Sequence, residues 1–284
     1  MTTDPYFRFG VELVNSRRLL LDALNALESQ RQSLTVVGAH AVYERVKGAS
    51  TTFAMDSTRD ADLAVFPELV TSRPHLGEVM ESLGLTLVSP SRPGVWGRID
   101  DLPGEPYSLQ TIDLIAPAAL AGPGRRAATL PGDHGKNSVS KTAGVELSLL
   151  DRSVMRWEAF DSTGGAAEAF VAGTAALVCA KAYKLHDRLD ARELNRNRER
   201  LRPKDAGDLW RLMQASDGTT IRAVFDAGIA DSRIGDAVAL GAEYVMALAA
   251  NPAQLQQLSI LHLRDSHAEA TVRTVIAEWI DGFR

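Results

Sequence analysis

Residues 57–65 read STRDADLAV, and this stretch predicts a strand with two acids immediately before its apolar residues. The apolar residues after Asp62 are typical of a buried strand, in which side chains alternate between the two faces. Asp60 and Asp62 therefore project from the same face. Neighbouring carboxylates repel each other unless a cation lies between them, and their oxygens suit Mg²⁺. The pair is a candidate metal site, with Mg²⁺ or Mn²⁺ as the ion.

The segments on either side of this acid pair fit a phosphate-binding metal site. Before it, an apolar run at 34–37 meets Gly38 and then a segment of helical character. A strand, a glycine turn and a helix N-terminus offer free N–H groups to an anion, so Gly38 and Ala39 are candidate phosphate contacts. After it, the apolar strand at 109–115 contains Asp113, and a buried carboxylate is costly without a partner. A metal ion bound by Asp113 as a third ligand would supply that partner.

The composition is that of a globular protein with one large domain or two smaller ones. The chain has 284 residues, of which 45% are hydrophobic and 24% charged, and its formal net charge is -5. This acidic balance excludes a general polyanion binder, so any nucleic-acid contact must come from local basic patches. The single cysteine, Cys179, excludes an internal disulfide, fits a reducing cytosol and is expected in the core. The sequence has no signal-peptide pattern and no apolar run of bilayer length, which favours a cytoplasmic protein without membrane contact.

The periodicity of apolar residues changes along the chain. Short strands and turns fill the first part, including an expected hairpin of strands 145–149 and 155–160. Beyond it, nearly every segment has helical spacing of its apolar residues. We therefore expect an α+β fold, with a mixed sheet and flanking helices over 1–163. A helical bundle over 164–284 is expected to follow, as a second lobe separated from the first by a cleft.

Basic residues gather in the first part of this helical region. Lys181, Lys184 and Arg188 share one helix face by their spacing, and acids on the same helix compensate them only in part. A solvated charged face explains such a stripe; alternatively, it holds a triphosphate and stabilises charge on the transferred group. An arginine-rich segment follows, and guanidinium groups bind phosphate in bidentate fashion, although an exposed, salt-bridged helix end has the same composition. Its candidate RNA contacts are Arg196, Arg198, Arg200 and Arg202.

These blocks, in this order, resemble the nucleotidyltransferase superfamily with a DNA polymerase beta-like fold, and more narrowly the AbiEii-type nucleotidyltransferase toxins with their MenT-like group. The narrower resemblance rests on KAYKLHDR at 181–188, which looks like the family's lysine–arginine motif. It rests equally on RPKDAGDLW at 202–210, which looks like its K-D-x-x-D-L motif. The resemblance covers about residues 34–213 and implies that the sheet-containing part, residues 1–163, is a nucleotidyltransferase domain. The chain departs from the family pattern at Ala39, where glycine or serine is usual, and at Asp56, where arginine is frequent.

The resemblance implies roles for individual residues. Asp60, Asp62 and Asp113 would hold the metal ions, and Asp113 would also help to activate the attacking hydroxyl. Lys181 and Asp205 would complete the catalytic residues, with Asp205 orienting Lys181 or the hydroxyl. The implied nucleotide-binding residues are Gly38, Ala39, Thr58, Lys181, Lys184 and Arg188.

The activity implied by the resemblance is that of a toxin from a toxin–antitoxin system. It would transfer a nucleoside monophosphate, from a pyrimidine triphosphate as donor, to the 3′ end of tRNA and so block aminoacylation. A cognate antitoxin protein would be its partner. Two alternatives remain open. One is a nucleotidyltransferase acting on a small molecule such as an antibiotic, or on a protein side chain; the other is a non-catalytic nucleotide- or RNA-binding module.

Overall fold

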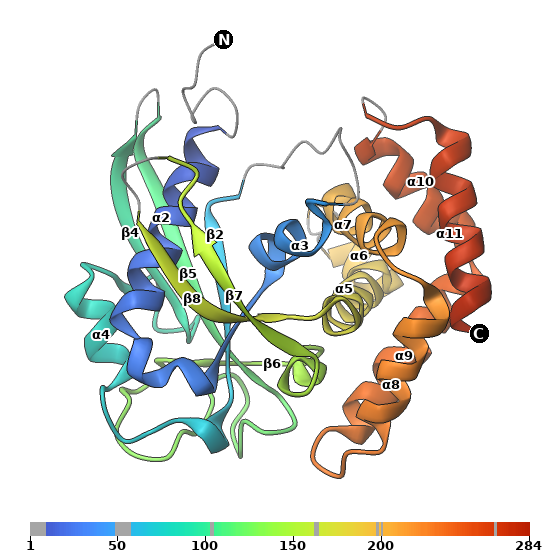
Figure 1. The fold of residues 1–284 in the computed structure, drawn as a ribbon. Coiled ribbons are helices and arrows are strands. Elements are labelled where there is room, and N and C mark those ends of the chain that lie inside the picture. The colour runs from blue at the N-terminus through green and yellow to red at the C-terminus, as the bar shows by residue number, and fades with distance from the viewer. Residues whose placement is uncertain are drawn as a thin grey trace. The chain divides into compact units, whose positions relative to one another are not determined.

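The computed structural model describes residues 10–48, 58–102, 105–161, 165–196, 199, 201–263 and 266–284. Within these residues the fold is α+β: a mixed eight-stranded sheet with helices comes first, and an all-helical region follows (Figure 1). The chain divides into two compact units. Unit 1 comprises Met1–Ala41, Met55–Thr142 and Arg152–Ala172, and unit 2 comprises Val42–Ala54, Ala143–Asp151 and Gly173–Arg284.

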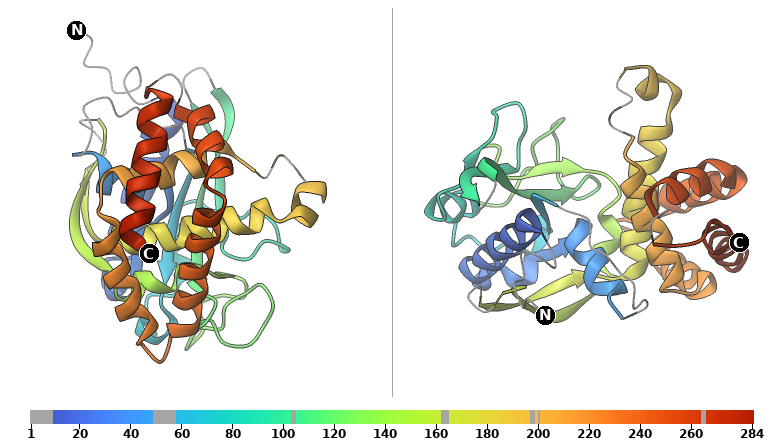
Figure 2. Two further views of the ribbon diagram at one scale, coloured as in Figure 1. Left: turned by 90° about the vertical axis from the view of Figure 1, so that its right-hand side faces the viewer. Right: turned by 90° about the horizontal axis from the view of Figure 1, so that it is seen from above.

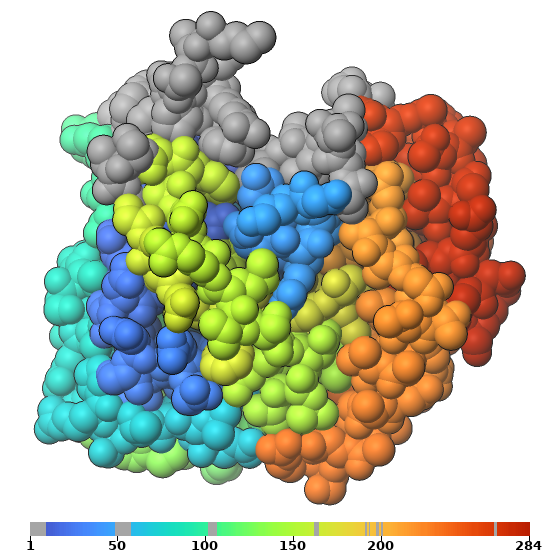
Figure 3. Space-filling view, in the orientation of Figure 1, coloured from blue at the N-terminus to red at the C-terminus, as the bar shows by residue number. Residues whose placement is uncertain are grey.

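The sheet belongs to unit 1, and its strand order is β3-β4-β5-β2-β1-β8-β7, with β6 paired to β5. The pairs β2–β5, β1–β8 and β5–β6 are parallel, and the others are antiparallel. In this order β7 ends one edge of the sheet, and it lies at the surface in the space-filling view (Figure 3). The strands are β1 (Leu34–Val37), β2 (Asp60–Val65), β3 (Thr86–Leu87), β4 (Val95–Leu102), β5 (Glu105–Pro117), β6 (Ser140–Thr142), β7 (Arg152–Glu158) and β8 (Ala166–Ala172).

The core of unit 1 lies between the sheet and helix α2 (Val11–Ala26), which contacts β2, β5 and β8 (Figure 1). Leu13, Leu20 and Leu24 recur at helical spacing and are buried on its inner face, as the sequence predicts. The remaining helical elements that precede β8 are the 3₁₀ helices η1 (Glu28–Ser33), η2 (Pro67–Leu69) and η3 (Glu146–Leu149), and the α-helices α3 (Gly38–Val46) and α4 (Leu76–Ser82).

Helices build most of unit 2. Its core contains the large buried side chains of Trp210, Phe225 and Phe283, and the ring of Phe283 stacks on that of Trp279 with centroids 5.1 Å apart. Helices α10 and α11 pack side by side (Figure 2). Among the described residues, no helix is both long enough and apolar enough to cross a bilayer. The helices are α5 (Thr174–Leu189), α6 (Ala191–Arg196), α7 (Pro203–Gln214), α8 (Gly218–Ile229), α9 (Gly235–Ala250), α10 (Pro252–Leu263) and α11 (Glu269–Phe283).

Two local expectations are wrong. The sheet continues through β8, past the expected start of the helical domain at residue 164, because this alanine-rich segment pairs with β1 and β7. Residues 145–149 were expected as a strand, but η3 forms there instead. The Glu146 carboxylate accepts a hydrogen bond from the Gly144 amide (2.6 Å), and the Ser148 hydroxyl donates to the Val145 carbonyl (2.6 Å). Such side-chain bonds to nearby backbone groups compete with strand pairing.

Candidate active site

The three predicted metal ligands of unit 1 lie on one face of the sheet. Strands β2 and β5 run parallel with Asp62 beside Asp113 and Asp60 beside Thr111. Because side chains alternate along a strand, Asp60, Asp62 and Asp113 share a face, and the intervening apolar residues fill the opposite one. Asp62 and Asp113 are half-buried, whereas Asp60 is exposed. The structure thus brings together two acids that are separated by 51 positions in the numbering (113 − 62).

Gly38 lies against the second of these acids. Strands β1 and β2 pair with Val37 beside Asp62, so the turn after β1 runs past that carboxylate. The φ of Gly38 is +67°, and a Cβ at this position would stand 2.8 Å from the carboxyl carbon of Asp62. Glycine is therefore needed for both conformation and space. Helix α3 begins here, with Ala39 half-buried in its first turn. A phosphate bound at this N-terminus would lie close to Asp62, which requires a cation between them.

Thr58 supports the first acid of the pair. It is buried, and its hydroxyl donates a hydrogen bond to the carboxylate of Asp60. The Thr58 hydroxyl thereby orients Asp60, and a contact between Thr58 and a nucleotide stays a prediction.

The donor set of this face fits a hard divalent cation. Among the residues that the structure describes, no three His, Cys, Asp or Glu side chains are arranged to hold a metal ion by themselves. The three predicted ligands therefore do not form a closed site. Mg²⁺ usually takes one or two protein carboxylates and completes its shell with water and substrate phosphates. Asp62 and Asp113, adjacent in register beside the glycine turn, meet that requirement.

Unit 2 contains a buried cluster of ion pairs between α5 and α7. The Lys181 ammonium donates to Asp205 (3.2 Å) and to Asp208 (2.6 Å). Asp205 is also paired with Lys184 (3.0 Å) and with Arg188. On its other side, Asp208 accepts from Arg211 at 3.2 Å, one turn further along α7. Pro203 starts α7, which places Asp205 in its first turn, where the helix dipole favours a negative charge.

The charges of this cluster stabilise one another. Burial by itself lowers the pKa of the Lys181 ammonium, but the facing carboxylates of Asp208 and Asp205 outweigh this effect and raise that pKa above its ordinary value. Burial raises the pKa of Asp205, whereas the three facing cations lower it to about 2. Both groups are therefore charged at neutral pH.

The cations of this cluster differ in their exposure to solvent. Four cations (Lys181, Lys184, Arg188 and Arg211) pair with Asp205 and Asp208. The Lys184 side chain is 46% exposed and that of Arg188 17%, whereas that of Lys181 is only 8% exposed. The predicted pairing of Lys181 with Asp205 is present. An anion in solution, however, meets Lys184 and Arg188 first, not Lys181.

Arg211 belongs to this cluster but was not predicted. Its sequence signal is its position three residues after Asp208 on one helix, where ion pairs are common. Asp208 was predicted only as part of the family motif. Of the candidate RNA contacts, Arg196 and Arg202 are exposed, and Arg202 directly precedes α7. Arg198 and Arg200 lie outside the described residues.

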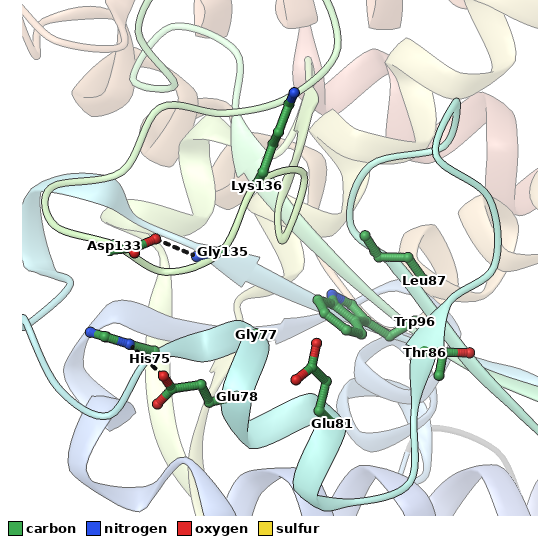
Figure 4. Close-up of a pocket in the computed structure, with 10 residues that line it drawn as sticks. All are labelled: His75, Gly77, Glu78, Glu81, Thr86, Leu87, Trp96, Asp133, Gly135 and Lys136. Carbon is green, nitrogen blue, oxygen red and sulfur yellow. Dashed lines mark hydrogen bonds and ion pairs between the residues drawn. The ribbon is translucent and has the colours of Figure 1, made fainter.

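A separate pocket of about 400 Å³ opens beside α4 and contains none of the predicted site residues (Figure 4). Trp96 forms one wall; it alternates with Val95 on β4 and so belongs to the sheet face opposite Asp113. The acid Glu78 is already hydrogen-bonded to His75 (3.0 Å). The acid face and the charge cluster therefore remain the candidate active-site elements.

The comparison with known proteins adds no relative. No protein-family model, curated protein or solved structure matches this chain.

Proposed function

We propose that this chain is a metal-dependent nucleotidyltransferase that acts as the toxin of a toxin–antitoxin system. It transfers a nucleoside monophosphate from a nucleoside triphosphate, with a pyrimidine as the base, to the 3′ end of tRNA. The observation that carries the proposal is the register of Asp62 beside Asp113, with the Gly38 turn against Asp62. Two adjacent carboxylates next to a helix N-terminus suit a divalent ion that bridges protein and phosphate.

In the proposed reaction, the oxygen of the acceptor hydroxyl forms a bond to the α-phosphorus, and the bond from that phosphorus to the pyrophosphate oxygen breaks. When bound, divalent ions stabilise the attacking and leaving oxygens of such an in-line displacement. Asp62 and Asp113 would hold them, with Asp60 held in place by Thr58. Asp113 is assigned to take the proton of the hydroxyl. The first turn of α3 would receive phosphate oxygens through its backbone N–H groups.

Unit 2 is assigned the binding of the triphosphate. Lys184 and Arg188 are the more exposed cations of its ion-pair cluster, and charge-assisted contacts to phosphate are the strong class of hydrogen bond. Lys181 would support these two cations without being the first to meet the triphosphate, since its ion pairs with Asp205 and Asp208 join α5 to α7. The exposed Arg196 and Arg202 favour an RNA acceptor.

Incubation of the protein with each α-labelled triphosphate, Mg²⁺ and total tRNA tests this proposal. Label in tRNA is the expected result. Label in a small molecule or in the protein itself would indicate a different acceptor. No transfer to any acceptor, together with binding of nucleotide or RNA, would indicate a non-catalytic module and contradict the proposal.

A further inference from the structure

The acid-bearing face of the sheet continues into an exposed apolar surface. Strands β4 and β5 pair with Val95 beside Asp113 and Ile99 beside Leu109, so Leu109 and Ile99 share the face of Asp113. Ile99 is 65% exposed, Leu109 39% and Val88 36%. We call these three residues, together with Tyr107, the apolar platform.

Gly97 makes the platform continuous. A Cβ at Gly97 would stand 2.8 Å from Cγ2 of Val88 and 3.0 Å from Cδ1 of Leu109. The two side chains therefore converge over the glycine, that of Leu109 from β5 and that of Val88 from the residue after β3. Arg98 and Asp100 of β4 alternate to the opposite face and pair with each other at 3.0 Å. Asp101, the third charged residue of β4, lies beyond Ile99 at the irregular end of the strand.

Tyr107, two residues before Leu109, has an unusual backbone conformation and an exposed ring. Its φ is +59°, which side-chain-bearing residues seldom adopt, and its ring is 79% exposed. The Asp101 carboxylate accepts a hydrogen bond from its amide at 3.1 Å and so supports this conformation. Because the ring is exposed, its burial does not offset the free-energy cost of this backbone conformation. A strained residue of this kind favours a role in binding.

We propose that the apolar platform stacks unpaired nucleobases of the acceptor strand next to its reacting 3′ end; this inference rests on the proposed function. Leu109 is four residues from Asp113, a distance of about 13 Å along a strand. A stacked nucleic-acid strand advances about 3.4 Å per nucleotide, so the platform lies within about four nucleotides of the acids. Unpaired bases stack on exposed aromatic side chains and pack against apolar ones, whereas phosphates need charge.

The size of the platform argues for bases and against a protein partner. Four side chains are far fewer than the roughly 20–30 residues per side of a standard protein interface. They match the faces of one or two bases. The acceptor end is the only part of the substrate that must reach the acids, so its last bases are the ones available to this surface.

The test uses the full chain and a fluorescein-labelled, eight-nucleotide single-stranded RNA with a free 3′ hydroxyl. Ile99→Ser/Leu109→Ser and Tyr107→Gly each remove part of the platform, and glycine also relieves the strain at residue 107. Val154→Ser is the matched control, because Val154 is 49% exposed on β7 at the other edge of the sheet. Fluorescence anisotropy measures strand affinity, and steady-state transfer assays measure KM for tRNA and for the triphosphate separately.

We expect both platform variants to bind the strand at least about fivefold more weakly than the wild type, and to raise KM for tRNA but not for the triphosphate. The control should match the wild type. Equal strand affinity in all four proteins, or no strand binding by the wild type, would overturn the inference. So would wild-type self-association that the double variant abolishes while strand affinity stays the same. Strand binding that depends on the platform, without any nucleotidyl transfer, would contradict the proposed function but support the platform as a strand-binding surface. Nucleotidyl transfer with unchanged strand affinity in the platform variants would support the proposed function but contradict the role of the platform.

Discussion

Asparagine in place of Asp205 should destabilise unit 2 more than any other single substitution in the charge cluster. The Asp205 carboxylate is buried, and three cations share it: Lys181, Lys184 and Arg188. Asp205→Asn keeps the shape of the side chain and removes its charge. Lys181 then keeps Asp208 as its ion-pair partner, and the cluster loses one negative charge.

The magnitude follows from the pKa of Asp205. A pKa lowered from 3.8 to about 2 corresponds to about 2.5 kcal/mol of preference for the charged form in the folded protein. Breaking a buried ion pair by removal of one partner costs about 3–5 kcal/mol. We therefore expect a loss of about 3 kcal/mol, which at this chain length lowers Tm by roughly 6–12 °C.

The pH dependence provides a second readout. Because the folded pKa of Asp205 lies below the unfolded value, its contribution to stability is complete above about pH 4 and is lost as the pH falls toward 2. The Tm difference between wild type and Asp205→Asn should therefore shrink between pH 4 and pH 2. Asp226→Asn is the matched control, since Asp226 forms an exposed pair with Arg222 (2.8 Å) worth at most about 1 kcal/mol. Calorimetry at pH 7 measures the Tm of both variants. An equal Tm for Asp205→Asn and Asp226→Asn would refute the reasoning.

Three further predictions concern the two units. Gly38→Ala should lower the rate of transfer at least tenfold, because its methyl group would collide with the Asp62 carboxylate; a wild-type rate would remove the glycine turn from the site. Gly173→Ala places a methyl group against the Asp151 carboxylate, which caps α5 by accepting a hydrogen bond from the Ala176 amide (2.8 Å). It should lower the free energy of unfolding by about 1–3 kcal/mol, measured by thermal unfolding. An unchanged Tm would contradict this. Lys184→Gln should raise KM for the triphosphate at least tenfold, since a charge-assisted hydrogen bond contributes about 1.5–3 kcal/mol, with little change in Tm. An unchanged KM would exclude Lys184 from triphosphate binding.

Much of the acid face of unit 1 can be predicted from the sequence, because alternation along a strand is a local rule. It puts Asp60 and Asp62 on one side without any knowledge of the sheet. The contact between Gly38 and Asp62 is different, since it depends on the antiparallel register of β1 and β2. Strand β8 escaped prediction because alanine has little preference for strands, and pairing with β1 and β7 decides its conformation.

The helical stripe of unit 2 shows the same limit. Helical spacing places Lys181 and Lys184 on one face, but it does not tell which of them is buried. That depends on the packing of α5 against α7, whose acids lie 24 to 27 residues further along the chain. Once Asp205 and Asp208 are in place, Lys181 becomes an internal ion-pair partner and Lys184 the accessible charge.

In the proposed function, Asp62 and Asp113 hold a divalent ion for nucleotidyl transfer. Electron paramagnetic resonance of bound Mn²⁺, in the presence of a non-hydrolysable nucleoside triphosphate analogue, tests it most directly. The wild type and Glu78→Gln, a control in the pocket beside α4, should bind Mn²⁺ alike, and Asp62→Asn and Asp113→Asn should lose at least tenfold in affinity. Equal Mn²⁺ affinity in all four proteins would contradict the claim.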